Sequence, residues 1–300
     1  MPGRRILSED DYIDPRYGPT RPDMVRRRAV LRETLNRFST ADPPNKYDLL
    51  AQENLERWRD STDQRHYSNQ VYVVGGDWGE VTHTLTKDRG CCFAALNMAN
   101  AFVPGGAYTV GAPAQEENMF RRTNCHFFVG PEEYDAARDR YHSHMTSLLS
   151  AENGKVYLDS ENPRVCIRGP EDRSRSDLGY HWLPDEEVFP FFELRAAAQD
   201  LRGGSTFSKS NARRRIAAQL NTLMDQGIQH AVLGASGCGA FKNPAHRIAQ
   251  LYRQELEKRK QGFKVLVFAI HHAGYGPDNL TPFKDVFRDP LEFATPPEDE

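Results

Sequence analysis

Apolar and polar residues along this chain follow two periods, and their order predicts helices and strands. Helical spacing predicts helices over residues 24–38, 47–60, 113–127, 134–149, 211–226 and 244–258. Short apolar or β-branched runs predict strands over residues 70–74, 91–97, 156–158, 165–167, 191–198, 230–233 and 264–270. Because strands alternate with helices, we expect an α/β fold with a mixed, mostly parallel sheet between helical layers.

The two ends of the chain carry weaker patterns. Residues 1–22 are rich in Pro, Arg and Asp without periodicity, which is typical of a loose arm. We therefore expect an arm with a helical extension over residues 1–65 and a single α/β domain over 66–288. An acidic, Pro-rich tail is expected over 289–300.

Composition narrows the class of protein. The 300 residues carry a formal net charge of −3, so no overall basic field favours nucleic acid, and direct nucleic-acid binding is not expected. The start has no apolar signal segment, and no apolar run approaches the roughly 20 residues of a membrane span. Five cysteines, an odd count without a CxxC pair, favour a reducing compartment. We expect an intracellular protein, cytoplasmic or nuclear, without a membrane partner.

One segment combines a glycine turn with acidic residues. Pro104-Gly105-Gly106-Ala107 is followed after seven residues by Gln115-Glu116-Glu117. A glycine-rich turn lets backbone N–H groups approach a phosphate closely, and adjacent carboxylates offer general acid and base chemistry. Alone, two adjacent glutamates are more often a solvated helical turn, so a second signal is needed.

That signal is a second glycine-rich turn, Gly234-Ala235-Ser236-Gly237-Cys238-Gly239-Ala240-Phe241, which follows the predicted strand 230–233. Both turns lie at the carboxyl ends of predicted strands, where sheets of this class bind ligands. Two phosphate-type loops and one carboxylate pair favour a diphosphate-bridged nucleotide that is cut at a sugar.

The segment from Leu96 through Gly105-Gly106 to Gln115-Glu116-Glu117 resembles the signature of the poly(ADP-ribose) glycohydrolases. The run from Val232 to Pro244 looks like the diphosphate loop of their bacterial-type branch, and the resemblance extends from about residue 24 to about residue 288. It implies a macrodomain-like three-layer α/β/α fold and an ADP-ribose-containing substrate, which is a polymer or an ADP-ribosylated protein. It implies no cofactor and no metal.

The resemblance also assigns roles. Glu117 would protonate the oxygen that leaves the ribose and then activate water, while Glu116 would hydrogen-bond ribose hydroxyls. ADP-ribose would be bound by Asn97, Asn100, Gly105, Gly106, Ala107, Gln115, Gly234, Ala235, Ser236, Gly237, Cys238, Gly239, Ala240 and Phe241. Asn97 and Asn100 equally fit buried residues that cap a strand end.

The chain departs from the family pattern at Ala107, where a third glycine is usual. A Cβ there either forbids a positive φ or crowds the phosphate and ribose, so it bears on the rate or on the substrate accepted. Three activities stay open: cleavage of poly(ADP-ribose), release of single ADP-ribose from protein side chains such as arginine, and binding of ADP-ribose without turnover.

Three other features have plainer interpretations. Cys238 reads as a small packed residue, because no neighbouring acid or base is implied. Asp77 follows a strand and is interpreted as a turn former rather than as an acceptor for adenine. The histidine pairs 142/144 and 271/272 lack further ligands at metal spacing.

Overall fold

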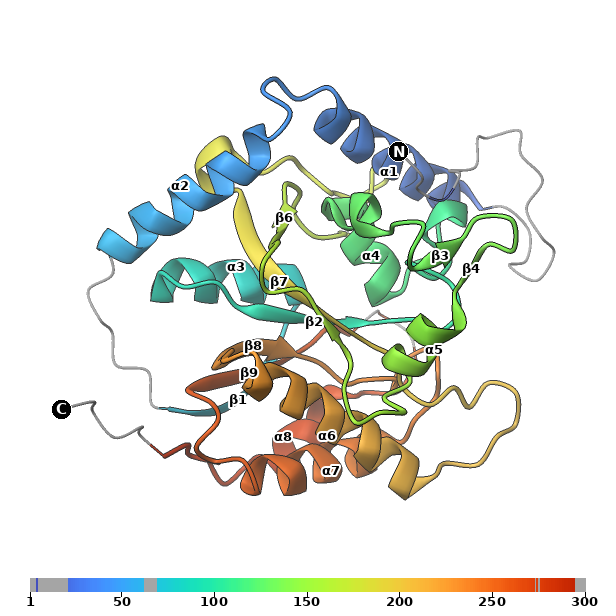
Figure 1. The fold of residues 1–300 in the computed structure, drawn as a ribbon, viewed down its shortest axis with the longest axis vertical. Helices are drawn as coiled ribbons and strands as arrows, with labels where there is room; N and C mark the ends of the chain where they lie inside the picture. The colour runs from blue at the N-terminus through green and yellow to red at the C-terminus, as the bar shows by residue number, and fades with distance from the viewer. Residues whose placement is uncertain (1–3, 5–20, 62–68, 273, 275, 295–300) are drawn as a thin grey trace.

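The fold is seen in a computed structural model, which describes residues 4, 21–61, 69–272, 274 and 276–294 (Figure 1). In this part of the chain the helices are α1 Pro22–Ser39, α2 Lys46–Ser61, α3 Trp78–Arg89, α4 Gln115–Arg122, α5 Ser143–Leu149, α6 Lys209–Asp225, α7 Ala245–Glu257 and α8 Leu280–Val286. The strands are β1 Gln70–Gly75, β2 Ala94–Met98, β3 Tyr134–Asp135, β4 Arg140–Tyr141, β5 Tyr157–Leu158, β6 Arg164–Cys166, β7 Phe189–Ala196, β8 His230–Leu233 and β9 Val265–Ile270.

Among the described residues, seven strands form one sheet in the order β1-β9-β8-β2-β7-β5, with β6 also paired to β7. The five strands from β1 to β7 run parallel, whereas β5 and β6 are antiparallel to β7. Helices α6, α7 and α8 cover one face, and α1 to α4 lie on the other (Figure 1). The predicted α/β fold, with helices on both faces of a mostly parallel sheet, is confirmed.

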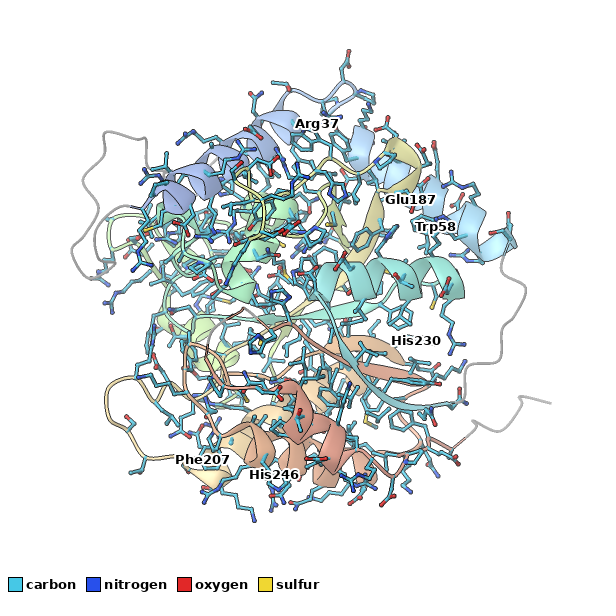
Figure 2. The ribbon with its side chains drawn as sticks, turned by 180° about the vertical axis from the view of Figure 1, so that it is seen from behind. Arg37, Trp58, Glu187, Phe207, His230 and His246 are labelled. Carbon is cyan, nitrogen blue, oxygen red and sulfur yellow. The ribbon has the colours of Figure 1, made fainter. Side chains whose placement is uncertain are left out.

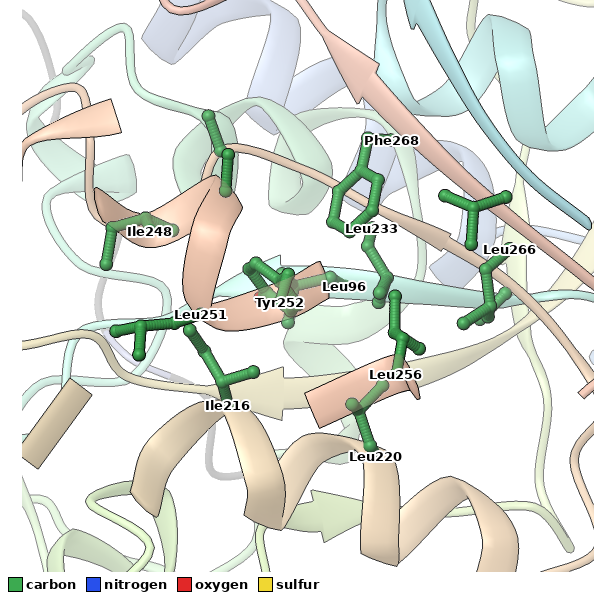
Figure 3. Close-up of a cluster of buried hydrophobic side chains, with 14 of the residues drawn as sticks. Leu96, Ile216, Leu220, Leu233, Ile248, Leu251, Tyr252, Leu256, Leu266 and Phe268 are labelled. Atoms are coloured by element: carbon green, nitrogen blue, oxygen red, sulfur yellow. The ribbon is translucent and has the colours of Figure 1, made fainter. Parts of the chain in front are cut away.

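The main core lies between the sheet and the helices α6 and α7. Leu96 of β2 and Leu233 of β8 meet Ile216 and Leu220 of α6 and Leu251 of α7 in this layer (Figure 3). All five side chains are buried. This face is therefore closed by apolar packing.

The N-terminal helices pack on the opposite face. In α1, Leu31 and Leu35 are buried in a cluster with Trp58 of α2 and Phe120 of α4. Thr34 Oγ1 of α1 donates to the carbonyl of Arg121 in α4 at 2.7 Å. The helical extension expected over residues 1–65 thus packs against the element that carries the predicted carboxylates.

Helix α2 also docks over α3 and the segment before β7. The ring centres of Trp58 and His83 lie 5.7 Å apart in an edge-to-face arrangement. His83 Nε2 lies 2.8 Å from Glu187 Oε2. Trp58 and Glu187 lie near one another on this outer face (Figure 2).

In the part of the chain that the structure describes, no helix has the length and apolarity to cross a bilayer.

One predicted helix is wrong over half its length. Residues 134–149 were expected to form one helix, but β3 and β4 form a hairpin before α5 begins at Ser143. The Asp135 side chain accepts hydrogen bonds from the amides of Ala137 and Arg138, and Asp139 has a φ of 50°. Side-chain bonds of this kind compete with helical hydrogen bonds, so a turn replaces the first helical turns.

Two further segments differ from expectation. Helix α3 has no counterpart among the predicted helices, although Asp77 caps its start by accepting from the amides of Gly79 and Glu80. The expected tail of residues 289–300 begins within the packed domain, because Leu291 and Phe293 are buried in the main core. Residues 295–300 lie outside the described residues.

Candidate active site

The two glycine loops leave the same edge of the sheet. Strands β2 and β8 are parallel neighbours, so the loops that follow them start side by side. A methyl group on Gly234, the first residue after β8, would collide with Met98 at the end of β2. Glycine at this position therefore leaves room for the Met98 side chain beside the end of the neighbouring strand.

The first loop needs glycine at two positions but not at the third. Gly105 and Gly106 have φ values of 66° and 58°, in the left-handed region that favours glycine. Ala107 has a φ of −101°, which any L-residue adopts. Of the two effects expected of a Cβ at residue 107, the conflict with a positive φ does not arise in this loop. The crowding of a bound phosphate and ribose stays a prediction.

Both predicted carboxylates converge on this loop. Glu117 Oε1 accepts from the amide of Ala107 at 3.0 Å, and Glu116 Oε2 accepts from the amide of Asn100 at 2.7 Å. A methyl group on Gly106 would lie 2.5 Å from Glu117 Oε1 and 2.9 Å from Glu116 Oε2. The two side chains, although adjacent on α4, thus reach the same point of the loop.

Both carboxylates are buried. The exposed fractions of Glu116 and Glu117 are 3% and 8%. Burial raises the pKa of Glu116 well above its ordinary range, and the neighbouring charge of Glu117 adds to this, while the Asn100 amide partly offsets it. Burial therefore favours the neutral form of Glu116, the carboxyl group that is expected to hydrogen-bond the ribose.

Three buried oxygen atoms at the site accept no hydrogen bond from the described protein: Asn97 Oδ1, Glu116 Oε1 and Glu117 Oε2. Buried acceptors in proteins are nearly always paired. These three oxygens therefore have no donor among the described residues.

The side chains of Gln115 and Asn100 form hydrogen bonds with the backbone of the protein. Gln115 Oε1 accepts from the amide of Met98, and its Nε2 donates to the carbonyl of Leu96, both at 2.9 Å. Gln115 therefore clamps the start of α4 to the end of β2. Asn100 Oδ1 accepts from the amides of Phe102 and Val103, as a residue capping a turn does. Their contact with ADP-ribose stays a prediction.

Asn97 leads into a buried ionic network that sequence reasoning missed. Its Nδ2 donates to Glu193 Oε1 at 2.7 Å, and Glu193 pairs with Arg195 at 3.0 Å and with Arg164 at 3.3 Å. Arg195 also pairs with Glu133 at 3.0 Å. Burial alone would raise the pKa of Glu193, but Arg195 and Arg164 outweigh it and lower the pKa to about 2. The signal for this network in the sequence was the acidic Glu193 and the basic Arg195, two positions apart in β7.

The second loop is tied together by its own backbone. Gly237 has a φ of 71°, and its carbonyl accepts from Asn243 Nδ2 at 3.1 Å. The amide of Cys238 donates to the carbonyl of Ala235 at 3.0 Å. Ala235, Ser236 and Cys238 are buried, whereas Gly239 and Ala240 are exposed at the tip. The exposed tip is the part that a diphosphate could reach.

Two side chains complete this loop. Phe241 is half-buried, and the Arg202 guanidinium lies 4.7 Å from the centre of its ring. Burial raises the pKa of the Cys238 thiol to about 12, which keeps it protonated and unreactive. Cys238 is packed, in agreement with its interpretation as a small buried residue.

Asp77 and two buried arginines hold α4 in place. Arg122 donates to Asp77 at 2.6 Å, and Arg121 donates to the hydroxyl of Tyr180 at 2.9 Å and to the carbonyl of Ala112 at 2.8 Å. Asp77 is thus engaged as a helix cap and an ion-pair partner. Within the described ranges no three His, Cys, Asp or Glu side chains gather as metal ligands would.

Comparisons with known proteins agree with this architecture. Residues 33–154 match the family model of the microbial-type PARG catalytic domain. The structure is similar to that of poly(ADP-ribose) glycohydrolase from Thermomonospora curvata, with a TM-score of 0.58 and 21% identity over 87% of this chain and 99% of that chain. The same enzyme bound to the inhibitor ADP-HPD gives a TM-score of 0.56 and 20% identity, over 87% and 98% of the two chains.

A third similar structure is the poly(ADP-ribose) glycohydrolase of Deinococcus radiodurans in complex with ADP-ribose. Its TM-score is 0.53 at 23% identity, over 82% of this chain and 92% of that chain. No curated protein sequence matches this chain. The family match covers both the first glycine loop and the carboxylate pair, and the fold likeness covers most of the chain. The resemblance of this chain to the microbial-type poly(ADP-ribose) glycohydrolase family is thereby confirmed.

Proposed function

We propose that this protein is an ADP-ribosyl glycohydrolase that cleaves the ribose linkage of poly(ADP-ribose). The observation that carries the proposal is the convergence of Glu116 and Glu117 on Gly106, where each keeps one buried oxygen without a protein donor. Ribose hydroxyls are donors, and a glycosidic oxygen needs a proton when it leaves. The likeness to glycohydrolases crystallised with ADP-ribose and with ADP-HPD supports the same ligand class.

In the proposed reaction, ADP-ribose lies across both glycine loops with its diphosphate at the exposed tip of residues 239–240. Glu116, held by the amide of Asn100, orients the ribose through its free oxygen. Glu117, held by the amide of Ala107, delivers a proton to the oxygen leaving the anomeric carbon. It then takes a proton from the water that attacks the oxocarbenium-like centre.

The bond that breaks would be the link between two riboses in the polymer. The same site could instead release ADP-ribose from an arginine side chain, since only the leaving group differs. A protein that binds ADP-ribose without turnover is the remaining alternative.

A turnover assay on two substrates separates these three activities. One substrate is poly(ADP-ribose) on an automodified polymerase, and the other is a protein with single ADP-ribose on arginine. The variants are Glu117→Gln and, as a matched control, Glu132→Gln, which alters an exposed glutamate. Release of ADP-ribose from the polymer, abolished only by Glu117→Gln, is the expected result.

The other outcomes lead to different conclusions. Release only from arginine would keep the site but change the substrate. No release from either substrate, while calorimetry shows that ADP-ribose still binds, would refute catalysis on these linkages and favour binding without turnover.

A further inference from the structure

Arg4 is buried against the first glycine loop, although it lies in the arm of the chain. Its Nη1 donates to the carbonyl of Gly106 at 2.6 Å and to the carbonyl of Pro104 at 2.9 Å. The guanidinium also lies 5.5 Å from the ring centre of Tyr108. One nitrogen therefore holds two carbonyl groups of the loop on the same side.

The opposite end of this guanidinium is fixed by the hairpin that replaces the predicted helix. Arg4 Nε and Nη2 donate to the two oxygens of Asp139, at 2.6 and 2.7 Å. The hydroxyl of Tyr134 donates to the same carboxylate at 2.6 Å. A two-pronged arginine–carboxylate pair fixes direction as well as distance, so the Nη1 group is aimed at the loop.

The carbonyl that Arg4 holds and the amide that holds the catalytic carboxylate belong to one peptide group. Gly106 supplies the C=O, and Ala107 supplies the N–H, which donates to Glu117 Oε1 at 3.0 Å. A positive donor on the oxygen of an amide polarises its N–H and strengthens the second bond, by about 10–30% in condensed-phase estimates. Arg4, this peptide and Glu117 form one continuous chain of hydrogen bonds.

We propose that Arg4 is a positioning residue, which orients the Gly106–Ala107 peptide so that its amide fixes Glu117 for proton transfer. The inference rests on the proposed function. Arg4 does not touch the reacting atoms; it acts through the peptide, whose orientation is free to change because both Gly105 and Gly106 are glycines. Its loss is expected to affect the chemical step more than the binding of ADP-ribose.

The test compares Arg4→Ala and Arg4→Lys with Arg138→Ala, which alters an exposed arginine beside Asp139. For Arg4→Ala we expect kcat to fall about 10-fold to 100-fold, the loss of a hydrogen bond to a charged group, while KM stays within about 3-fold. Arg4→Lys keeps a cationic donor but not the two-pronged pair, so it should fall in between. Guanidinium ion added to Arg4→Ala should restore part of kcat, and Arg138→Ala should match wild type.

A second readout does not depend on turnover. Selective ¹⁵N-alanine labelling gives an amide resonance for Ala107, which is assigned by its disappearance in Ala107→Gly. In Arg4→Ala this resonance should move upfield as its hydrogen bond weakens. An unchanged kcat and an unchanged Ala107 resonance in Arg4→Ala would overturn the inference, and so would an equal loss in Arg138→Ala. An inactive wild type whose Ala107 resonance still responds to Arg4 would instead count against the proposed function.

Discussion

Replacing Gly106 by alanine tests the carboxylate site most directly, because the structure gives the size of the collision. The added methyl carbon would lie 2.5 Å from Glu117 Oε1 and 2.9 Å from Glu116 Oε2. To reach an ordinary contact of 3.4 Å, Glu117 Oε1 would have to move by about 0.9 Å. A misplacement of about 1 Å costs on the order of 100-fold in rate, so Gly106→Ala should lower kcat by about that factor.

The same substitution should also lower stability, through two separate causes. The φ of 58° is left-handed, which costs an L-residue about 1–2 kcal/mol. Overpacking against two buried carboxylates adds about 1–3 kcal/mol. Gly154→Ala isolates the first cause, since Gly154 has a φ of 72° and no atom within 4 Å of the added carbon. It should lose only about 1–2 kcal/mol and keep full activity.

The assay pairs urea unfolding with initial rates of ADP-ribose release for Gly106→Ala, Gly154→Ala and Ala107→Gly. Rates are measured where each variant is fully folded, so that lost stability does not appear as lost activity. Ala107→Gly changes the neighbouring residue at a φ of −101° and keeps the amide, so its kcat should stay near that of wild type. The reasoning would be refuted by a folded Gly106→Ala variant with the kcat of wild type, or by an equal loss in Ala107→Gly.

Three further substitutions test the electrostatics of the site. Glu116→Gln should raise the melting temperature measured by calorimetry, because the raised pKa of Glu116 makes its ionisation costly only in the folded state. The increase in melting temperature should become larger as pH rises above about 4.3. An increase that becomes smaller as pH rises would contradict this reasoning. Glu193→Gln should cost about 3–5 kcal/mol in urea unfolding, since it removes the buried carboxylate that Arg164 and Arg195 share and leaves each arginine with one carboxylate partner, Asp159 and Glu133 respectively. In wild type, the contribution of Glu193 to stability is present above about pH 4.3 and is lost as pH falls toward its folded pKa of about 2. Cys238→Ala should keep turnover. In the wild-type protein, mass spectrometry should find Cys238 unmodified by iodoacetamide near pH 8, because the pKa of its thiol is raised to about 12. Rapid labelling would contradict this, since it would show that the thiol is accessible and ionised.

Elements with a clear apolar period could be predicted closely from the sequence. The strand expected over residues 230–233 is β8, His230–Leu233, and the helix expected over 211–226 is α6, Lys209–Asp225. Helix α3 escaped prediction because threonine, which loses side-chain freedom in a helix, occupies three of its 12 positions. Its cap at Asp77 and the left-handed Gly90 after its end were the signals available.

The residues of the candidate site also differ in whether the sequence predicts them. The glycines and the glutamate pair lie within a short segment, and their chemistry can be read from residue types and spacing. Arg4 and the Glu193–Arg195 pair could not be found in this way. Arg4 meets Gly106 across 102 positions, and Glu193 reaches Asn97 across 96. Such contacts depend on strand order and on the β3–β4 hairpin, for which a helix was predicted instead.

The replacement at residue 107 shows why a motif has to be judged by what each position supplies. Taken by residue type, alanine for the third glycine counts against catalysis. In the structure the left-handed angles are at Gly105 and Gly106, and the close approach of both glutamates is at Gly106. Residue 107 supplies an N–H to Glu117 at an ordinary φ, which every residue except proline can do. The replacement of glycine by alanine therefore lies at the position of this loop that does not require glycine. The N–H that holds Glu117, the proposed acid, is kept.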